Sequence, residues 1–269
     1  MWVACAQMRS TTDVAHNLDQ IARQVRRAAG IGAVLVATPE NSTFLGPSTA
    51  KLAIAEPLDG PTHRALGDIA RTEHIWLLVG SVAELGPTDR CYNTSLLFDD
   101  QGELRAFYRK IHLFDVNIPN GPSFQESSFV APGSDLVVAD SPAGRLGLSV
   151  CFDVRFPGMY RSLVQRGATV LTVPSAFTVP TGKDHWHLLL RARAVETQSY
   201  VLAPAQDGRH DTQGNRHSYG HSLIVDPWGT VLADAGEGNP EGLAVADIDL
   251  GLVERVRANM PLRSPLSEG

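Results

Sequence analysis

Glu40, Lys110 and Cys151 lie far apart in the sequence, and each follows or flanks an apolar run that predicts a buried strand. Glu40 comes directly after the run 33–37, where a carboxylate is costly to bury unless it has a partner or a task. Arg109 and Lys110 alternate within an aromatic and aliphatic stretch, so on a strand one of them would point into the interior. Taken singly, Glu40 is equally explained as an exposed loop residue, and Lys110 as a buried stem whose amine reaches solvent.

Cys151 ends a predicted strand over 146–150 and precedes a predicted helix over 157–166. A thiol on a tight turn from strand to helix is exposed at the sheet edge, where backbone N–H groups can hold an oxyanion. This position favours a nucleophile, although a lone buried cysteine is usually inert. Cys5 and Cys91 have no such turn and are expected to be core thiols. The cysteine spacing fits neither a disulfide framework nor a cysteine zinc site.

Nine histidines raise the question of a metal, and two pairs stand out: His185 with His187, and His217 with His221. The second pair has i, i+4 spacing, but it straddles a predicted strand or loop and not a helix. No carboxylate accompanies it in a known zinc pattern, so we expect no metal. The sequence also lacks a Walker loop and a G-x-G-x-x-G motif, which disfavours nucleotide use.

The elements that must position these residues occur twice. The segment 32–39 matches 167–174, and the segment 92–102 matches 219–229. The two segments of the second pair both end in a turn with Asp first and Gly fourth. We therefore predict two copies of β-α-β-α-β-β-β, the first beginning at Trp2. A coincidence of apolar strands is the alternative explanation.

Periodicity predicts the helices of each copy. Apolar residues from Leu18 to Ala29 fall on one face of a helix, and Gly30 occupies the position of a C-terminal cap. Further helices are predicted over 62–72 and 184–197, each leading to an apolar strand. Two sheets packed face to face, with helices outside, would accommodate this pattern.

Composition limits the function classes. The 269 residues are 43% hydrophobic and 19% charged, which excludes global disorder. A formal net charge of −6, without a basic run, argues against nucleic-acid binding. No apolar stretch approaches the roughly 20 residues that span a bilayer, and no signal peptide is recognised, so we expect a cytoplasmic protein without a membrane partner. Without a composition break, residues 1–269 are expected to form a single domain.

Taken together, the segments 38–40, 108–113 and 150–157 resemble the nitrilase superfamily of carbon–nitrogen hydrolases. That family carries a Glu, Lys, Cys triad in this order, and the resemblance covers nearly the whole chain. It implies an α/β fold, a four-layer αββα sandwich with an internal pseudo-two-fold repeat, and a homodimer or higher homo-oligomer. It also implies no metal and no organic cofactor.

Within the superfamily, the sequence most resembles the amidases that act on deaminated glutathione. The related ω-amidases tend to have Gly where Ser175 stands. Thr38 and Gly158 depart from the usual pattern, and Gly158 removes a charge near the nucleophile turn. The similarity lies in the segments 174–177, 191–198, 208–210, 218–222 and 226–229.

The resemblance implies a role for each candidate residue. Cys151 would attack the amide carbon, Glu40 would move the protons, and Lys110 with a backbone N–H at Phe152 would hold the oxyanion. Glu126 would be the additional carboxylate that family members place beside the lysine and the general base; a loop glutamate is the alternative.

On the substrate side, Arg155 would pair with a substrate carboxylate, unless it forms a structural ion pair with Asp153 or Glu196. Ser175, Ala176 and Phe177 would line the same mouth.

The implied function is an amidase that hydrolyses a small carboxylate-bearing primary amide to acid and ammonia through a cysteine thioester. Deaminated glutathione is the best single candidate for the substrate. The alternatives are an ω-amidase, an N-carbamoyl amino acid hydrolase, a nitrilase, and a non-catalytic binding protein that kept the scaffold.

Overall fold

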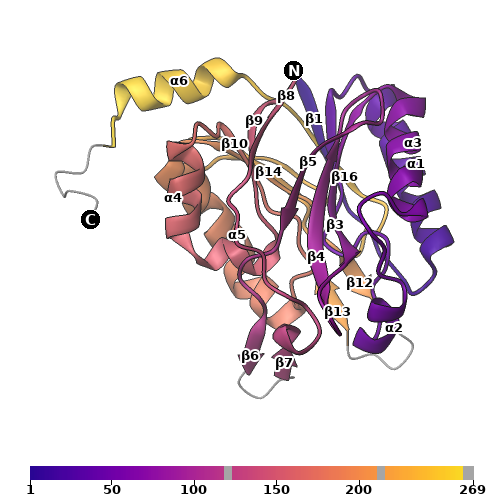
Figure 1. Cartoon of the computed structure of the whole chain (residues 1–269). Coiled ribbons are helices and arrows are strands. Elements are labelled where there is room, and N and C mark those ends of the chain that lie inside the picture. The colour runs from indigo at the N-terminus through magenta and orange to yellow at the C-terminus, as the bar shows by residue number, and fades with distance from the viewer. Residues whose placement is uncertain (118–122, 211–215, 263–269) are drawn as a thin grey trace.

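The fold consists of two six-stranded sheets packed against each other, with helices on both outer faces (Figure 1). The structure is a computed structural model that describes residues 1–117, 123–210 and 216–262. This arrangement is the predicted four-layer αββα sandwich. No helix in the described part of the chain has the length and apolarity needed to cross a membrane.

The first sheet has the strand order β16-β1-β2-β3-β4-β5. Its three central strands, β1, β2 and β3, are parallel, and β16, β4 and β5 run antiparallel to their neighbours. The bounds are β1 Trp2–Ala6, β2 Leu35–Ala37, β3 Trp76–Leu85, β4 Cys91–Phe98, β5 Leu104–Arg109 and β16 Leu243–Asp247.

The second sheet repeats this pattern in the order β15-β14-β11-β10-β9-β8. Here β9, β10 and β11 are parallel, and β8, β14 and β15 are antiparallel. The two copies of β-α-β-α-β-β-β are therefore confirmed, and each sheet gains a sixth strand that the repeat did not include. The bounds are β8 Val138–Ser141, β9 Gly144–Leu148, β10 Val170–Thr172, β11 Tyr200–Ala203, β14 Leu223–Val225 and β15 Val231–Asp234.

Helices α1 and α3 cover the outer face of the first sheet, and α4 and α5 cover that of the second (Figure 1). Two short hairpins, β6–β7 and β12–β13, lie with α2 at the lower end of the view. The helices are α1 Val14–Gly30, α2 Ser48–Ala53, α3 Pro61–Glu73, α4 Pro157–Gln165, α5 Val179–Thr197 and α6 Leu250–Asn259. The hairpin strands are β6 Asp115–Asn117, β7 Ser123–Gln125, β12 Asp207–Arg209 and β13 His217–Tyr219.

The continuous apolar runs of the central strands are explained by the two layers that cover them. Leu35 and Leu146 are fully buried in the core between the sheets, and Val36 is fully buried under α1 and α3. Each such side chain contributes about 1.5–3 kcal/mol through burial. The central strands are therefore packed on both faces, and this packing holds the residues at their ends in place.

The predicted turns agree with the structure, but two helix ends differ. Helix α5, predicted over 184–197, begins earlier, at Val179. Gly102 and Gly229 take positive φ angles, and their N–H groups donate to Asp99 O and Asp226 O. Gly30 is the last helical residue of α1 and not its C-terminal cap; the left-handed position is Gly32, with φ 78°. The chain runs two residues further before it needs a residue without Cβ.

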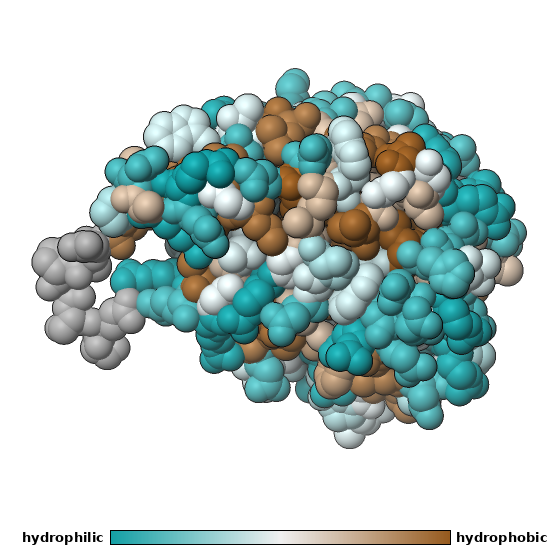
Figure 2. Space-filling view, turned by 90° about the horizontal axis from the view of Figure 1, so that it is seen from above, coloured by the Kyte–Doolittle hydropathy of each residue, from teal (hydrophilic) through white to brown (hydrophobic). Residues whose placement is uncertain are grey.

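Figure 2 shows the face above the starts of β1 and β9, turned away from the hairpins. Its hydrophobic side chains occur in separate groups among hydrophilic ones. The cavity described next lies at the opposite end of the parallel strands.

Candidate active site

Glu40, Lys110 and Cys151 meet at one end of the sandwich, in the wall of a cavity of about 470 Å³. Glu40 follows β2, Cys151 follows β9, and Lys110 follows β5, the edge strand of the first sheet. Because the carboxyl ends of parallel strands open at the same edge, the pseudo-two-fold repeat brings both ends to a shared mouth. The cavity wall also contains Glu126, Phe152, Arg155, Ala176 and Phe177.

Lys110 lies between two carboxylates. Its Nζ donates to Glu40 Oε1 at 3.0 Å and to Glu126 Oε2 at 2.9 Å, and its side chain is 1% exposed. Burial alone would lower the pKa of Lys110, but Glu126 and Glu40 outweigh it and raise that pKa well above its usual value. Lys110 is therefore a permanent ammonium inside the cavity wall.

Asn93 holds the two carboxylates in place from the other side. Its Nδ2 donates to Glu40 Oε1 at 3.0 Å and to Glu126 Oε1 at 3.1 Å. Glu40 Oε2 also accepts from the backbone N–H of Ala176 at 3.0 Å. With three donors on one buried carboxylate, Glu40 is oriented before any ligand arrives, as a proton-transfer group requires.

Cys151 occupies a strained turn. Its φ is 50°, in the left-handed region that is unfavourable for a residue with a Cβ. Its N–H donates to Pro174 O at 2.9 Å, and this bond fixes the turn against the end of the segment 167–174. Cys151 opens a 3₁₀ turn over Cys151–Arg155, so the N–H of the next residue, Phe152, has no acceptor within that turn. That N–H is the predicted oxyanion donor.

The surroundings of Cys151 favour the protonated thiol. Burial raises its pKa well above the usual value, Glu40 raises it further by charge and a hydrogen bond, and Lys110 acts in the opposite direction. A buried thiol hydrogen-bonded to a carboxylate and close to an ammonium is an arrangement suited to covalent acyl transfer, because the carboxylate can remove the proton during attack.

Asp153 fastens the Cys151 turn to the strand that carries Lys110. Its carboxylate is fully buried and accepts from the Val150 N–H at 2.8 Å, the Tyr108 hydroxyl at 2.8 Å and the His112 N–H at 3.0 Å. From the sequence, Asp153 was predicted only as a possible partner of Arg155. The feature of the sequence that could have found this role is the position of Asp153 two residues after Cys151, where a buried carboxylate must find donors.

Arg155 reaches the cavity without an ion pair among the described residues. Asp153 is bonded as above, and Glu196 pairs with Arg193 at 2.6 Å, so the alternative of a structural ion pair for Arg155 is wrong. The guanidinium lies over the rings of Phe152 and Phe177, at 5.9 and 5.7 Å from their centroids. It also contacts His185 Nδ1 at 3.1 Å.

The segment 175–177 contributes to the cavity in two of its three positions. Ala176 offers its N–H to Glu40, and Phe177 lines the wall beside Arg155. Ser175 is not among the residues that line the cavity: it is fully buried, and its hydroxyl donates to Val173 O at 3.1 Å. Its backbone pairs with the segment after β11, which turns the side chain into the protein.

Comparison with known proteins agrees with this geometry. The family model for carbon–nitrogen hydrolases matches residues 2–258. The chain belongs to the carbon–nitrogen hydrolase family. It is a hydrolase that acts on non-peptide C–N bonds.

One curated relative and two solved structures illustrate the likeness of this carbon–nitrogen hydrolase. A deaminated glutathione amidase of Synechocystis sp. is 44% identical over 262 residues, covering 96% of this chain and 95% of that protein. The structure of Saccharomyces cerevisiae Nit3, a member of branch 10 of the nitrilase superfamily, has a TM-score of 0.87 at 33% identity and covers 98% of this chain and 96% of its own.

The third is a mutant amidase of Nesterenkonia sp. AN1, solved after Michael addition of acrylamide at its active-site cysteine. It has a TM-score of 0.79 at 31% identity and covers 97% of this chain and 98% of its own.

This hydrolase places a second lysine in the cavity wall that sequence reasoning missed. Lys51 is 6% exposed, and its amine donates to Asn41 Oδ1 at 2.6 Å. Burial lowers the pKa of Lys51, while nearby groups such as Cys91 and Glu126 act against that. A lysine in the short helix α2 carries no sequence signal of burial. Asn93 did carry one, as a polar residue within a buried strand.

We expect His210 to make the stability of the hydrolase dependent on pH. Its Nδ1–H donates to Ser10 O, and its Nε2 accepts from the Ser218 hydroxyl, both at 2.9 Å. Burial lowers the pKa of His210 to about 4, so the unfolded chain binds this proton first. We expect His210 to reduce the free energy of unfolding by up to roughly 3 kcal/mol as pH falls from about 6.5 to 4.

Urea denaturation at several pH values measures this loss. In His210→Gln the part of the pH dependence due to His210 should disappear, whereas His16→Gln, at an exposed histidine, should retain it. Equal pH profiles for His210→Gln and the unmodified chain would contradict the assignment.

Proposed function

We propose that this protein is a cysteine amidase that forms a thioester on Cys151. The observation that carries the proposal is the Lys110 ammonium held between Glu40 and Glu126 beside the Cys151 thiol. Burying three charged groups together is costly because each loses its hydration, so such a cluster indicates a functional site. The acrylamide adduct on the active-site cysteine of the Nesterenkonia amidase supports the same role for Cys151.

In the first half-reaction, the Cys151 sulfur attacks the amide carbon while its proton moves to Glu40. The carbonyl π electrons move to oxygen, and the Lys110 ammonium and the Phe152 N–H stabilise the resulting oxyanion. The oxyanion then reforms the carbonyl, the C–N bond breaks, and Glu40 returns its proton to the leaving nitrogen. The acyl group remains as a thioester on Cys151.

In the second half-reaction, Glu40 removes a proton from water as the water oxygen attacks the thioester carbon. Lys110 and Phe152 stabilise the second oxyanion in the same place. When this intermediate collapses, the C–S bond breaks, the carboxylic acid is released, and Cys151 recovers a proton. One carboxylate therefore serves both steps, which agrees with the three donors that hold it.

We propose small amides bearing a carboxylate as substrates, with deaminated glutathione as the leading candidate. The names of the relatives support this, as do two cations in the cavity wall, Arg155 and Lys51. Guanidinium groups bind carboxylates bidentately. In deaminated glutathione the scissile nitrogen belongs to cysteinylglycine, so that amine would leave; a primary amide would release ammonia.

The test compares kcat/KM for deaminated glutathione, 2-oxoglutaramate, an N-carbamoyl amino acid and an aliphatic nitrile. Both ammonia and free cysteinylglycine are measured, since the leaving group differs between substrates. We expect an amide to lead by at least about tenfold. A lead of that size for the carbamoyl compound or the nitrile would contradict the substrate class while leaving the thioester mechanism in place.

Arg155→Met should raise KM for a carboxylate-bearing amide roughly 10- to 100-fold, with a smaller effect on kcat. The expected magnitude is that of a lost charged hydrogen bond. Arg105→Met, which removes an arginine far from the cavity, is the control. An unchanged KM in Arg155→Met would assign substrate binding to another cation, with Lys51→Met as the next variant to measure.

We also propose that the protein forms a homodimer through the exposed face of α5. Leu188 and Val195 stand two turns apart on that helix, and Gly229, the residue after Trp228, lies close to Val195; Leu188 and Trp228 are 68% and 62% exposed. Large exposed apolar side chains in one stripe are typical of an interface.

We expect light scattering to give twice the chain mass for the unmodified protein and the single-chain mass for Leu188→Glu. Leu85→Glu, at a leucine on the other sheet that is 59% exposed, should remain dimeric. A dimer that survives Leu188→Glu would place the interface elsewhere.

A further inference from the structure

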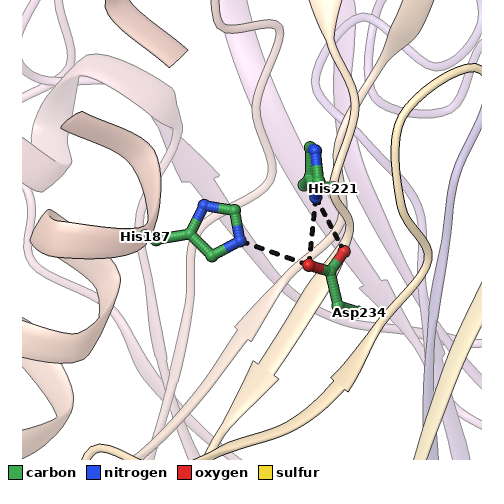
Figure 3. Close-up of side chains that lie close together, drawn as sticks. All are labelled: His187, His221 and Asp234. Carbon is green, nitrogen blue, oxygen red and sulfur yellow. Dashed lines mark hydrogen bonds and ion pairs between the residues drawn. The ribbon is translucent and has the colours of Figure 1, made fainter. Parts of the chain in front are cut away.

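Two histidines and an aspartate converge on the outside of the second sheet, away from the cavity. His187 comes from α5, His221 from the loop before β14, and Asp234 ends β15 (Figure 3). His187 Nε2 lies 3.2 Å from Asp234 Oδ2, and His221 Nδ1 lies 3.0 Å from both carboxylate oxygens. None of the three residues lines the cavity described above.

The loop that carries His221 is held in one conformation. His221 has a φ of 59°, an unfavourable angle for a residue with a Cβ. Its N–H donates to Gly236 O at 3.1 Å, and its carbonyl accepts from Trp186 Nε1 at 2.8 Å. Trp186 is fully buried and precedes His187 in α5, so one hydrogen bond joins the two segments that bear the histidines.

Further contacts orient the side chains of His221 and Asp234. The Tyr219 ring stacks on His221, with centroids 4.6 Å apart. Asp234 Oδ1 accepts from the Gly236 N–H at 2.8 Å, which fixes the carboxylate. Such outer contacts are typical of metal centres, where they set the direction of each ligand before the ion binds.

We propose that His187 Nε2, His221 Nδ1 and one oxygen of Asp234 bind Zn²⁺, with water as the fourth ligand. Zn–N and Zn–O distances of about 2.1 Å place tetrahedral ligand atoms roughly 3.4 Å apart. The nitrogen–oxygen distances are already 3.0–3.2 Å, and the three ligand atoms all lie within 4.8 Å of one another. Binding therefore needs only small side-chain movements, and each neutral imidazole shifts its proton from the ligand nitrogen to its other ring nitrogen, so that a lone pair faces the metal.

This set differs from the histidine pairs that the sequence suggested. The cluster contains one histidine of each pair, His187 and His221, and leaves out the other two. It also contains a carboxylate that no short sequence motif links to the histidines. The bound ion would cross-link α5 to the β14–β15 hairpin. It would do so independently of Cys151, so the proposal does not rest on the proposed amidase mechanism.

Titration calorimetry with Zn²⁺ tests the site, using full-length untagged protein with Cys151→Ala so that the catalytic thiol cannot bind zinc. We expect one ion per chain, and an affinity lowered at least about tenfold in His187→Gln and in Asp234→Asn. His217→Gln, a member of the rejected sequence pair, is the matched control and should bind zinc as tightly as its parent.

Thermal unfolding supplies a second measurement. Zinc should raise Tm of the parent and of His217→Gln, and should leave Tm of His187→Gln and Asp234→Asn unchanged, because a ligand that binds the folded state stabilises it. A parent that binds no zinc would reduce the cluster to a hydrogen-bonded His–Asp–His network and overturn the proposal. If His187→Gln and Asp234→Asn bound zinc as tightly as the parent, the proposal would also be overturned.

Discussion

Replacing Cys151 with alanine is expected to lower kcat by roughly 10⁴- to 10⁶-fold, as loss of a catalytic nucleophile does elsewhere. Alanine fits the space, and the N–H of residue 151 that donates to Pro174 O remains, so the turn should persist. Cys5→Ala and Cys91→Ala should keep turnover because neither thiol lines the cavity.

Mass spectrometry provides a direct check on the intermediate. An acyl adduct should appear on the unmodified chain during turnover and be absent from Cys151→Ala. Residual activity near normal in a folded Cys151→Ala protein would end the covalent mechanism.

Glu40→Gln is expected to lower kcat/KM by about 10²- to 10⁴-fold, the usual contribution of a general base. The amide keeps the shape of the carboxylate but cannot take the thiol proton, and its NH₂ group would face the donors of Lys110 or Asn93. Both half-reactions should slow, because the same oxygen atoms serve thiol and water.

The matched control is Glu84→Gln, the same change at a buried glutamate whose carboxylate pairs with Arg109 and accepts from Thr94. That variant should lose stability and retain kcat. Single-turnover kinetics that show normal acylation in Glu40→Gln would assign the proton transfer to another group, with Glu126 next in position.

The sequence predicted the parts of this molecule that depend on local pattern. Apolar runs identified the central strands because both faces of each sheet are covered, and the ends of those strands located Glu40 and Cys151. The alternation of Arg109 and Lys110 predicted that one of the two would point inward. The structure shows that this residue is Lys110, while Arg109 pairs with Glu84.

Other features depend on contacts between segments that no short pattern connects. Ser175 follows a strand as Glu40 does, yet its side chain turns inward because its backbone pairs with the segment after β11. Neither of the alternative partners of Arg155 pairs with it, because Asp153 and Glu196 bind other donors. The cluster of His187, His221 and Asp234 assembles from three elements, so the spacing of its histidines in the sequence was misleading.

The exchange of edge strands between the two repeats has a consequence for how the chain is made. β16 belongs to the second half by sequence but pairs with β1, and the amino group of Met1 binds Asp247 at 2.5 Å. During synthesis the first sheet therefore keeps an unpaired edge at β1 until almost the whole chain has emerged. An exposed edge in a long-lived intermediate invites pairing with other chains. Truncation before β16 should thus give aggregation of nascent protein, and not a smaller active fragment.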